Sequence, residues 1–195
     1  NLIKDAFLDP QKGYTHFIYL EDDIALDFNN FCYFVHLRDV LKHKRLIPSF
    51  LRVETNNKNQ IVSSDSAYKI AVNKHPQAPY KHLLFINLNE PFCGCYILDK
   101  ELAIEHINSP SFDLKNSSKI CNLGTRMRAA MGLCFENIPH PFYHRFVIPV
   151  DANHLTCPFY AQVSHIQTSF AKTSPSLESK IPLDSLFYFT QKGEK

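Results

Sequence analysis

Glycine is scarce in this chain, with 5 among 195 residues. Neither of the two common phosphate-binding patterns, GxGxxG and GxxxxGK[ST], occurs anywhere in the sequence. Such loops need glycine because the backbone itself must approach the phosphates closely. A nucleotide bound by this chain must therefore be held by a site that lacks such a glycine-rich loop.

Long apolar runs and an excess of charge of one sign are also missing. The longest apolar runs are short, such as residues 83–86, whereas a membrane-spanning helix needs about 20 apolar residues. With 21 Lys and Arg against 19 Asp and Glu, the net charge is +2, and nucleic-acid-binding proteins normally carry a strong basic excess. We therefore expect no transmembrane segment in this chain and no nucleic-acid partner.

The cysteines form neither a metal-binding pattern nor a disulfide-rich one. No CxxC pair occurs, and 6 cysteines in 195 residues are far fewer than a disulfide scaffold contains. Most lie in apolar stretches, such as Asn30-Phe31-Cys32-Tyr33-Phe34, where a thiol behaves as a small hydrophobic group. We expect buried, reduced thiols.

The remaining composition is typical of a globular domain. Apolar residues make up 45% and charged residues 21% of the chain, and 195 residues is about the length of one domain. We expect a single domain over residues 1–195, with its core in residues 1–170. A polar loop and a last C-terminal element are expected over residues 171–195.

The apolar periodicity predicts strands that alternate with helices. A buried strand is expected over residues 17–20, and Asp27 is expected to cap a helix with the apolar face Phe28, Phe31, Cys32 and Val35. Further strands are expected over residues 50–54, 68–72, 83–88, 95–98, 146–150 and 161–166. Further helices are expected over residues 101–107, capped by Asp99, and from residue 117 or 118 to 134. This alternation indicates the α/β class, with a mixed sheet flanked by helices.

Three consecutive acids, Glu21-Asp22-Asp23, follow the first expected strand. Carboxylates this close repel one another unless a cation or hydrogen-bond donors compensate. In open α/β sheets, ligands bind just outside the carboxyl ends of the strands, and carboxylate oxygens suit Mg²⁺ or Mn²⁺. The cluster predicts a divalent metal site; the alternative is an acidic turn that caps the following helix.

The strand, the acid cluster and the aromatic-rich segment Asp27-Phe28-Asn29-Asn30-Phe31-Cys32-Tyr33-Phe34 resemble the DxD region of GT-A-fold glycosyltransferases. The Glu-Asp-Asp form is especially similar to that of N-acetylglucosaminyltransferase I-like enzymes. The resemblance implies a Rossmann-like GT-A fold, a nucleotide-sugar donor, and Mn²⁺ or Mg²⁺ bridging the diphosphate. It also implies that Asp23 is a metal ligand and that Asp22 and Glu21 shape the nucleotide site.

Two later segments extend the resemblance, which spans roughly residues 14–170. Pro91-Phe92-Cys93-Gly94-Cys95-Tyr96-Ile97-Leu98-Asp99-Lys100-Glu101-Leu102 resembles the acceptor-side strand and helix of the superfamily. Asn122-Leu123-Gly124-Thr125-Arg126-Met127-Arg128-Ala129-Ala130-Met131-Gly132-Leu133 resembles the next helix. Since GT-A domains usually carry nucleotide-binding strand–helix units before the acidic motif, the resemblance implies that this chain lacks its first part.

Further candidate residues come from the resemblance and from strand geometry. Inverting members place a carboxylate just before the second helix as general base, but Lys119-Ile120-Cys121-Asn122 contains none. Asp113 upstream is our candidate, and Glu136 lies downstream. His165 resembles the C-terminal His that several members supply as a further metal ligand. Arg52 and Glu54 share one strand face, where they either line the substrate crevice or pair with each other.

Together these features predict a glycosyltransferase that moves a sugar from a nucleotide-sugar donor to a hydroxyl of a glycan or another acceptor. The missing carboxylate before Asn122 leaves open a catalytically inactive sugar- or nucleotide-binding module on the same fold. A metal-dependent hydrolase is a weaker alternative, because no second group of His and Asp ligands is evident. We expect a cytoplasmic location, or the Golgi lumen if an anchor precedes Asn1.

Overall fold

The computed structural model describes residues 5, 9–64, 66–88, 94–117, 141–167, 172–177 and 180–191. Its described helices are α2 (Phe28–Leu41), α3 (Lys100–Asn108) and α4 (Leu114–Ser117). Its described strands are β1 (His16–Leu20), β2 (Ile24–Ala25), β3 (Ile47–Pro48), β4 (Leu51–Thr55), β5 (Ile61–Ser63), β6 (Ile70–Ala71), β7 (Ala78–Tyr80), β8 (Leu83–Ile86), β9 (Cys95–Asp99), β10 (Phe146–Asp151), β11 (Gln162–His165) and β12 (Phe187–Tyr188). Most of the helix predicted to end at residue 134 lies outside the described residues, as does Glu136.

The described strands form four sheets rather than the one mixed sheet that the sequence predicts. Two sheets have four strands, in the orders β3-β10-β8-β7 and β2-β11-β4-β5, and two are the ribbons β1-β9 and β12-β6. Each larger sheet combines parallel and antiparallel pairs, as β11 does with β4 and β2. The α/β class with mixed pairing is confirmed. The division into four sheets was not predicted, because apolar periodicity marks strands without identifying their partners.

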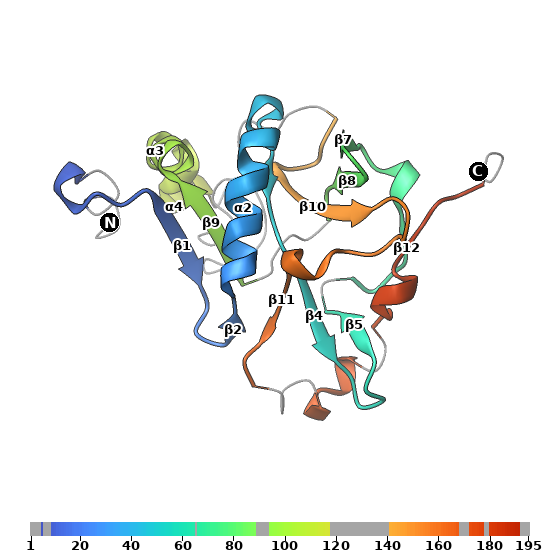
Figure 1. Cartoon of the computed structure of the whole chain (residues 1–195). Coiled ribbons are helices and arrows are strands. Elements are labelled where there is room, and N and C mark those ends of the chain that lie inside the picture. The colour runs from blue at the N-terminus through green and yellow to red at the C-terminus, as the bar shows by residue number, and fades with distance from the viewer. Residues whose placement is uncertain are drawn as a thin grey trace.

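Helix α2 lies between the β1-β9 ribbon and the larger sheets (Figure 1). On one side, the ring of His16 in β1 packs edge-on against Phe31 and Phe34 of α2, with centroids 5.1 and 6.3 Å apart. Elsewhere on the helix, the Tyr33 hydroxyl donates a 2.9 Å hydrogen bond to the carbonyl oxygen of Ser49, directly after β3. The helix therefore joins the acid-bearing ribbon to the rest of the core.

The start of α2 is as predicted, but its buried face is not. Asp27 caps the helix in a capping box with Asn30, and the two hydrogen bonds are 2.8 and 2.9 Å long. Of the predicted apolar face, Phe31 packs against the core, but Phe28 is 76% exposed, Val35 is 38% exposed and Cys32 is also exposed. The buried residues of the helix are Asn30, Tyr33, Phe34, Leu37, Arg38 and Leu41. Because apolar residues lie on both sides of this helix, their spacing could not show which side faces the core.

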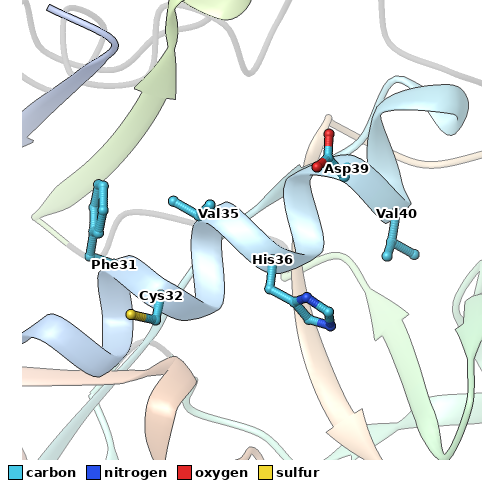
Figure 2. Close-up of a pocket in the computed structure, with 6 residues that line it drawn as sticks. All are labelled: Phe31, Cys32, Val35, His36, Asp39 and Val40. Atoms are coloured by element: carbon cyan, nitrogen blue, oxygen red, sulfur yellow. The ribbon is translucent and has the colours of Figure 1, made fainter.

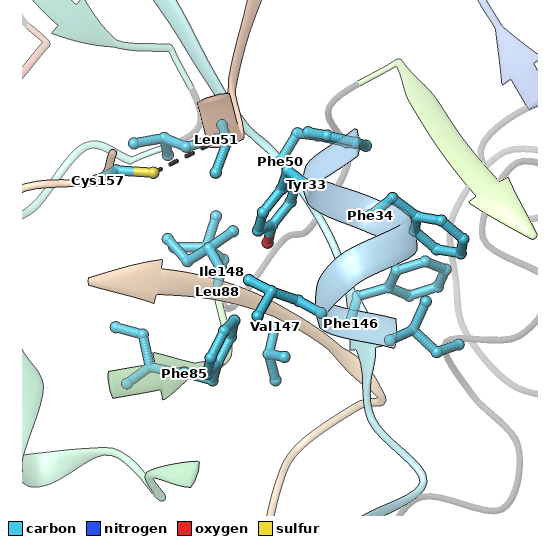
Figure 3. Packing of buried hydrophobic residues seen from close by; sticks show 14 of the residues in the cluster. Tyr33, Phe34, Phe50, Leu51, Phe85, Leu88, Phe146, Val147, Ile148 and Cys157 are labelled. Carbon is cyan, nitrogen blue, oxygen red and sulfur yellow. Dashed lines mark hydrogen bonds between the residues drawn. The ribbon is translucent and has the colours of Figure 1, made fainter. Parts of the chain in front are cut away.

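The core between α2 and the larger sheets is aromatic-rich and closely packed (Figure 3). Phe34, Phe50 and Phe85 are fully buried in it. Cys157 lies at its edge, where burial raises the pKa of the thiol well above its ordinary value. Cys95 is also buried, as expected, but Cys32 is exposed because it lies on the outer side of α2. The expectation of a buried thiol is therefore wrong for Cys32.

Strand β1 exists where predicted but is not buried. Ile18 is 47% exposed and Leu20 is 45% exposed, because β1 pairs with β9 and turns one face to solvent. Strands β4, β8, β9, β10 and β11 confirm the predicted strands within a residue or two. Within the described part of the chain, no helix is both long enough and apolar enough to cross a membrane.

Helix α3 begins as predicted and is tied to α2. The Asp99 side chain accepts a 2.7 Å hydrogen bond from the backbone N–H of Leu102 and so caps the helix. Its second oxygen accepts a 2.8 Å bond from Nε of Arg38, whose side chain is 7% exposed. Asp99 therefore fixes both the start of α3 and its position beside α2.

Candidate active site

The three acids lie in the tight connection between β1 and β2. The backbone N–H of Glu21 donates to the carbonyl oxygen of Gly94 at 2.9 Å, and that of Ile24 donates to the Glu21 carbonyl oxygen at 3.1 Å. Glu21 is half-buried, and its Oε1 accepts a 3.4 Å hydrogen bond from the Tyr19 hydroxyl. Asp22 and Asp23 are exposed. The turn therefore presents two carboxylates to solvent and holds the third against the protein.

Gly94 is needed for this turn to pack against the start of β9. Its φ is +74°, a conformation that residues with a Cβ rarely adopt. A Cβ at this position would lie 2.7 Å from Cγ1 of Ile24 and 3.2 Å from Oε2 of Glu21. The absence of a side chain at Gly94 thus allows the acid-bearing turn to approach β9 closely.

Strand β11 brings His165 to the acid-bearing turn. In the antiparallel pairing of β11 with β2, His165 lies opposite Ile24, and the Ile166 N–H donates to the Asp23 carbonyl oxygen at 2.7 Å. Nε2 of His165 lies 3.9 Å from Oδ2 of Asp23. The two residues that the resemblance implies as ligands of one metal, 142 positions apart in the numbering (165 − 23), therefore face each other.

Glu54 reaches the same histidine from the opposite side. Strand β4 pairs in parallel with β11, and Oε1 of Glu54 accepts the backbone N–H of His165 at 3.1 Å. The same oxygen lies 2.5 Å from Nδ1 of His165. The Glu54 side chain is only 3% exposed. The residue expected to bind substrate thus has its carboxylate inside the protein, against His165.

The other predicted site residues lie in different surroundings. Nε of Arg52 donates to the Ser64 hydroxyl at 3.1 Å, and the same hydroxyl donates back to the Arg52 carbonyl oxygen. Asp113 is exposed, and its Oδ1 accepts a 2.7 Å bond from the Lys115 N–H. Asp113 precedes α4, which lies beside α3 at the opposite end of β1 from β2 (Figure 1). The structure therefore does not bring Asp113 to the Asp23–His165 pair.

Sequence reasoning missed how the histidine is held. Nδ2 of the buried Asn30 donates to the carbonyl oxygens of Tyr160 and Gln162, at 2.8 and 3.0 Å, and so fixes the start of β11. Asn30 was visible only as part of the aromatic-rich segment after Asp27. Neither its bond to β11 nor that of Glu54 to His165 leaves a local pattern in the sequence, because both depend on strand pairing.

The residues at this site suit a divalent cation. Neighbouring ligands of an octahedral Mn²⁺ or Mg²⁺ ion, each at about 2.1 Å from it, lie about 3.0 Å apart. Nε2 of His165 lies 3.9 Å from Oδ2 of Asp23, so a rotation of the exposed Asp23 side chain is needed to bring both onto one ion. A metal-binding histidine usually donates its other ring N–H to a carboxylate, the position that Glu54 occupies. No group of three or more His, Cys, Asp or Glu suited to a metal occurs among the described residues. The described part of the chain thus offers two ligands, and phosphate and water commonly fill other positions around these ions.

A hollow on the outer side of α2 is the other surface feature of note. It is lined by Phe31, Cys32, Val35, His36, Asp39 and Val40 (Figure 2). Its carboxylate, Asp39, pairs with Lys42 at 2.7 Å, and this hydrogen bond lowers the pKa of Asp39. The hollow contains none of the predicted site residues.

No protein-family model, curated protein or solved structure matches this chain.

Proposed function

We propose that this chain is a glycosyltransferase domain of the GT-A type, which moves a sugar from a nucleotide-sugar donor to a hydroxyl of a glycan or another acceptor. The observation that carries the proposal is the 3.9 Å approach of His165 Nε2 to Asp23 Oδ2. Asp23 ends a Glu-Asp-Asp motif after a strand, and His165 ends a strand near the other end of the described chain. Their meeting supports one shared cation site.

In this proposal, Asp23 and His165 hold Mn²⁺ or Mg²⁺. When bound, the cation neutralises charge on the leaving diphosphate. Asp23 is suited to this role because its side chain is 50% exposed, so a diphosphate in solution can reach it. Asp22 and Glu21 flank the ligand and would contact the nucleotide. Glu21 is the better fixed of the two, through its contact with Tyr19.

The proposal is tested by a screen of nucleotide sugars with Mn²⁺, in which release of the nucleoside diphosphate is measured. We expect one donor class to give Mn²⁺-dependent release that Asp23→Asn abolishes. Asp39→Asn is the matched control, since Asp39 is an exposed carboxylate on α2 with a 77% exposed side chain. Equal release by wild type and Asp23→Asn would contradict the proposal.

A second candidate function is a sugar- or nucleotide-binding module without turnover. The position of α4 favours it, because α4, which directly follows the predicted base Asp113, lies beside α3 at the opposite end of β1 from β2 (Figure 1). The two candidates differ in turnover, because only a transferase releases diphosphate from the donor. If Asp113 is nevertheless the general base, Asp113→Asn lowers kcat by about a hundredfold or more and leaves Mn²⁺-dependent donor binding intact. A module without turnover binds the donor and releases no diphosphate in either form.

A further inference from the structure

We infer that Glu54 is a positioning residue, which keeps the imidazole proton of His165 on Nδ1 and so leaves the Nε2 lone pair facing Asp23. The inference deepens the proposed function and rests on it in one respect, namely that Asp23 and His165 share a cation. It assigns Glu54 to the histidine rather than to the substrate.

Glu54 accepts hydrogen bonds from His165. Oε1 of Glu54 accepts the backbone N–H of His165 at 3.1 Å, so this oxygen acts as an acceptor. The same oxygen lies 2.5 Å from Nδ1 of His165. An ionised carboxylate can only accept hydrogen bonds, so an ionised Glu54 places the proton that joins the two groups on Nδ1.

The proton on Nδ1 decides the state of Nε2, the other ring nitrogen of His165. A neutral imidazole has one N–H, and the hydrogen bond made by one nitrogen decides the state of the other. With the proton on Nδ1, Nε2 has a lone pair, and this nitrogen lies 3.9 Å from Oδ2 of Asp23. With the proton on Nε2, that N–H would point toward Asp23 and the nitrogen could not bind a cation.

Burial decreases from Glu54 through His165 to Asp23. The exposed fraction of the side chains rises from 3% for Glu54 to 10% for His165 and 50% for Asp23. β11 lies between β4 and β2, so Glu54 approaches His165 from the strand on one side and Asp23 from the turn before the strand on the other. The Glu54 carboxylate, which holds the ring, is thus kept from water, while the Asp23 carboxylate, which would share the cation, is exposed to water. A Glu54 carboxylate that bound substrate would itself have to be exposed.

The tautomer can be measured directly in the metal-free 195-residue chain. Nitrogen-15 correlation spectra of the imidazole rings, recorded as a pH series, distinguish the two neutral forms from the doubly protonated ring and show which nitrogen carries hydrogen. We expect the Nδ1–H form for His165 in the wild type and in Glu54→Gln, whose amide oxygen can still accept. We expect Glu54→Ala to lose this preference. A wild-type His165 in the Nε2–H form would overturn the inference, and this result needs no variant to fold.

Mn²⁺ titrations then test whether the tautomer matters for the cation. We expect Glu54→Ala to weaken Mn²⁺ binding about tenfold to a hundredfold, with Glu54→Gln recovering most of the loss. In a His165→Ala background, Glu54→Ala should cause no further loss, because Glu54 acts through the ring. A full additional loss in that background would overturn the inference.

The two levels of the account fail separately. If Asp23→Ala leaves Mn²⁺ affinity unchanged while His165 has the Nδ1–H form, the proposed cation site is wrong and the assignment of Glu54 to the tautomer stands. If Asp23→Ala and His165→Ala both weaken binding while Glu54→Ala does not, the cation site stands and the inference is wrong.

Discussion

The side chain of Asn30 donates hydrogen bonds to the backbone carbonyl oxygens of Tyr160 and Gln162, at 2.8 and 3.0 Å. The first turn of α2 is thereby attached to the start of β11, three residues before His165. The same side chain also accepts the Asp27 N–H at 2.8 Å in the capping box. One buried amide thus connects the helix that follows the acidic motif to the strand that carries the histidine.

We predict that Asn30→Ala destabilises the protein by about 2–3 kcal/mol, because two part-buried carbonyl groups and a helix cap lose their partner. Urea denaturation at pH 7 measures the loss. Asn29→Ala is the matched control, since Asn29 is exposed in the same turn and makes only a 3.5 Å contact with Asp27. We expect the control to change stability by less than about 0.5 kcal/mol. Equal effects of the two changes would show that the bonds to β11 contribute little.

The two described glycines with positive φ provide a matched pair for the acid-bearing turn. Gly13 has φ +63°, and a Cβ there would have nothing within 4 Å, whereas a Cβ on Gly94 would lie 2.7 Å from Ile24 Cγ1. We expect Gly13→Ala to cost about 1–2 kcal/mol from backbone strain alone. We expect Gly94→Ala to cost about 1–3 kcal/mol more, and to weaken Mn²⁺ binding because the turn must shift. Equal losses of stability in urea denaturation would contradict the close approach at Gly94.

His144 predicts a loss of stability in mild acid. The side chain is buried, its Nε2 contacts the Leu88 carbonyl oxygen, and burial lowers the pKa of His144 to about 4. In the unfolded chain a histidine has an ordinary pKa of about 6.5. Between these two values the unfolded state binds more protons than the folded state, so stability falls as pH falls through this window.

The full effect of this one group is about 3 kcal/mol, reached near the lower end of the window. Urea denaturation at pH 7 and pH 5 covers part of the window, and we expect a loss of about 2 kcal/mol from this group between them. We expect His144→Gln, whose amide can still donate to Leu88, to reduce the difference between the two pH values. An unchanged pH dependence in this variant would assign the effect to other groups.

Local features of the sequence were the ones that predicted structure well. Asp27 and Asp99 were predicted to cap helices, and both do, because a cap needs only the backbone N–H three residues later. The buried face of α2 was not predictable from spacing, since Phe28 and Val35 on one side compete with Phe34 and Leu37 on the other. Exposure of β1 depends on which strands pair with it, which its own residues do not encode.

At the candidate site, too, the sequence predicted individual residues but not the contacts between them. The resemblance to GT-A enzymes predicted Asp23 and His165 as ligands of one metal, whereas their spacing in the sequence carries no sign that they would meet. The role of Glu54 depends on the pairing of β4 with β11 across 111 residues, and so could not be read from either segment. Alternation placed Glu54 and Arg52 on one strand face, but the structure was needed to find the histidine between Glu54 and Asp23.

The most direct test of the account is a Mn²⁺ titration of the whole chain, with free Mn²⁺ measured by electron paramagnetic resonance. We predict that Asp23→Ala and His165→Ala each weaken Mn²⁺ binding at least about tenfold. Loss of a residue that only supports a metal ligand typically lowers metal affinity by about tenfold or more, and loss of a ligand itself should do no less. Asp39→Asn should bind as the wild type does. Wild-type affinity in both Asp23→Ala and His165→Ala would contradict the claim that these two side chains share a divalent cation.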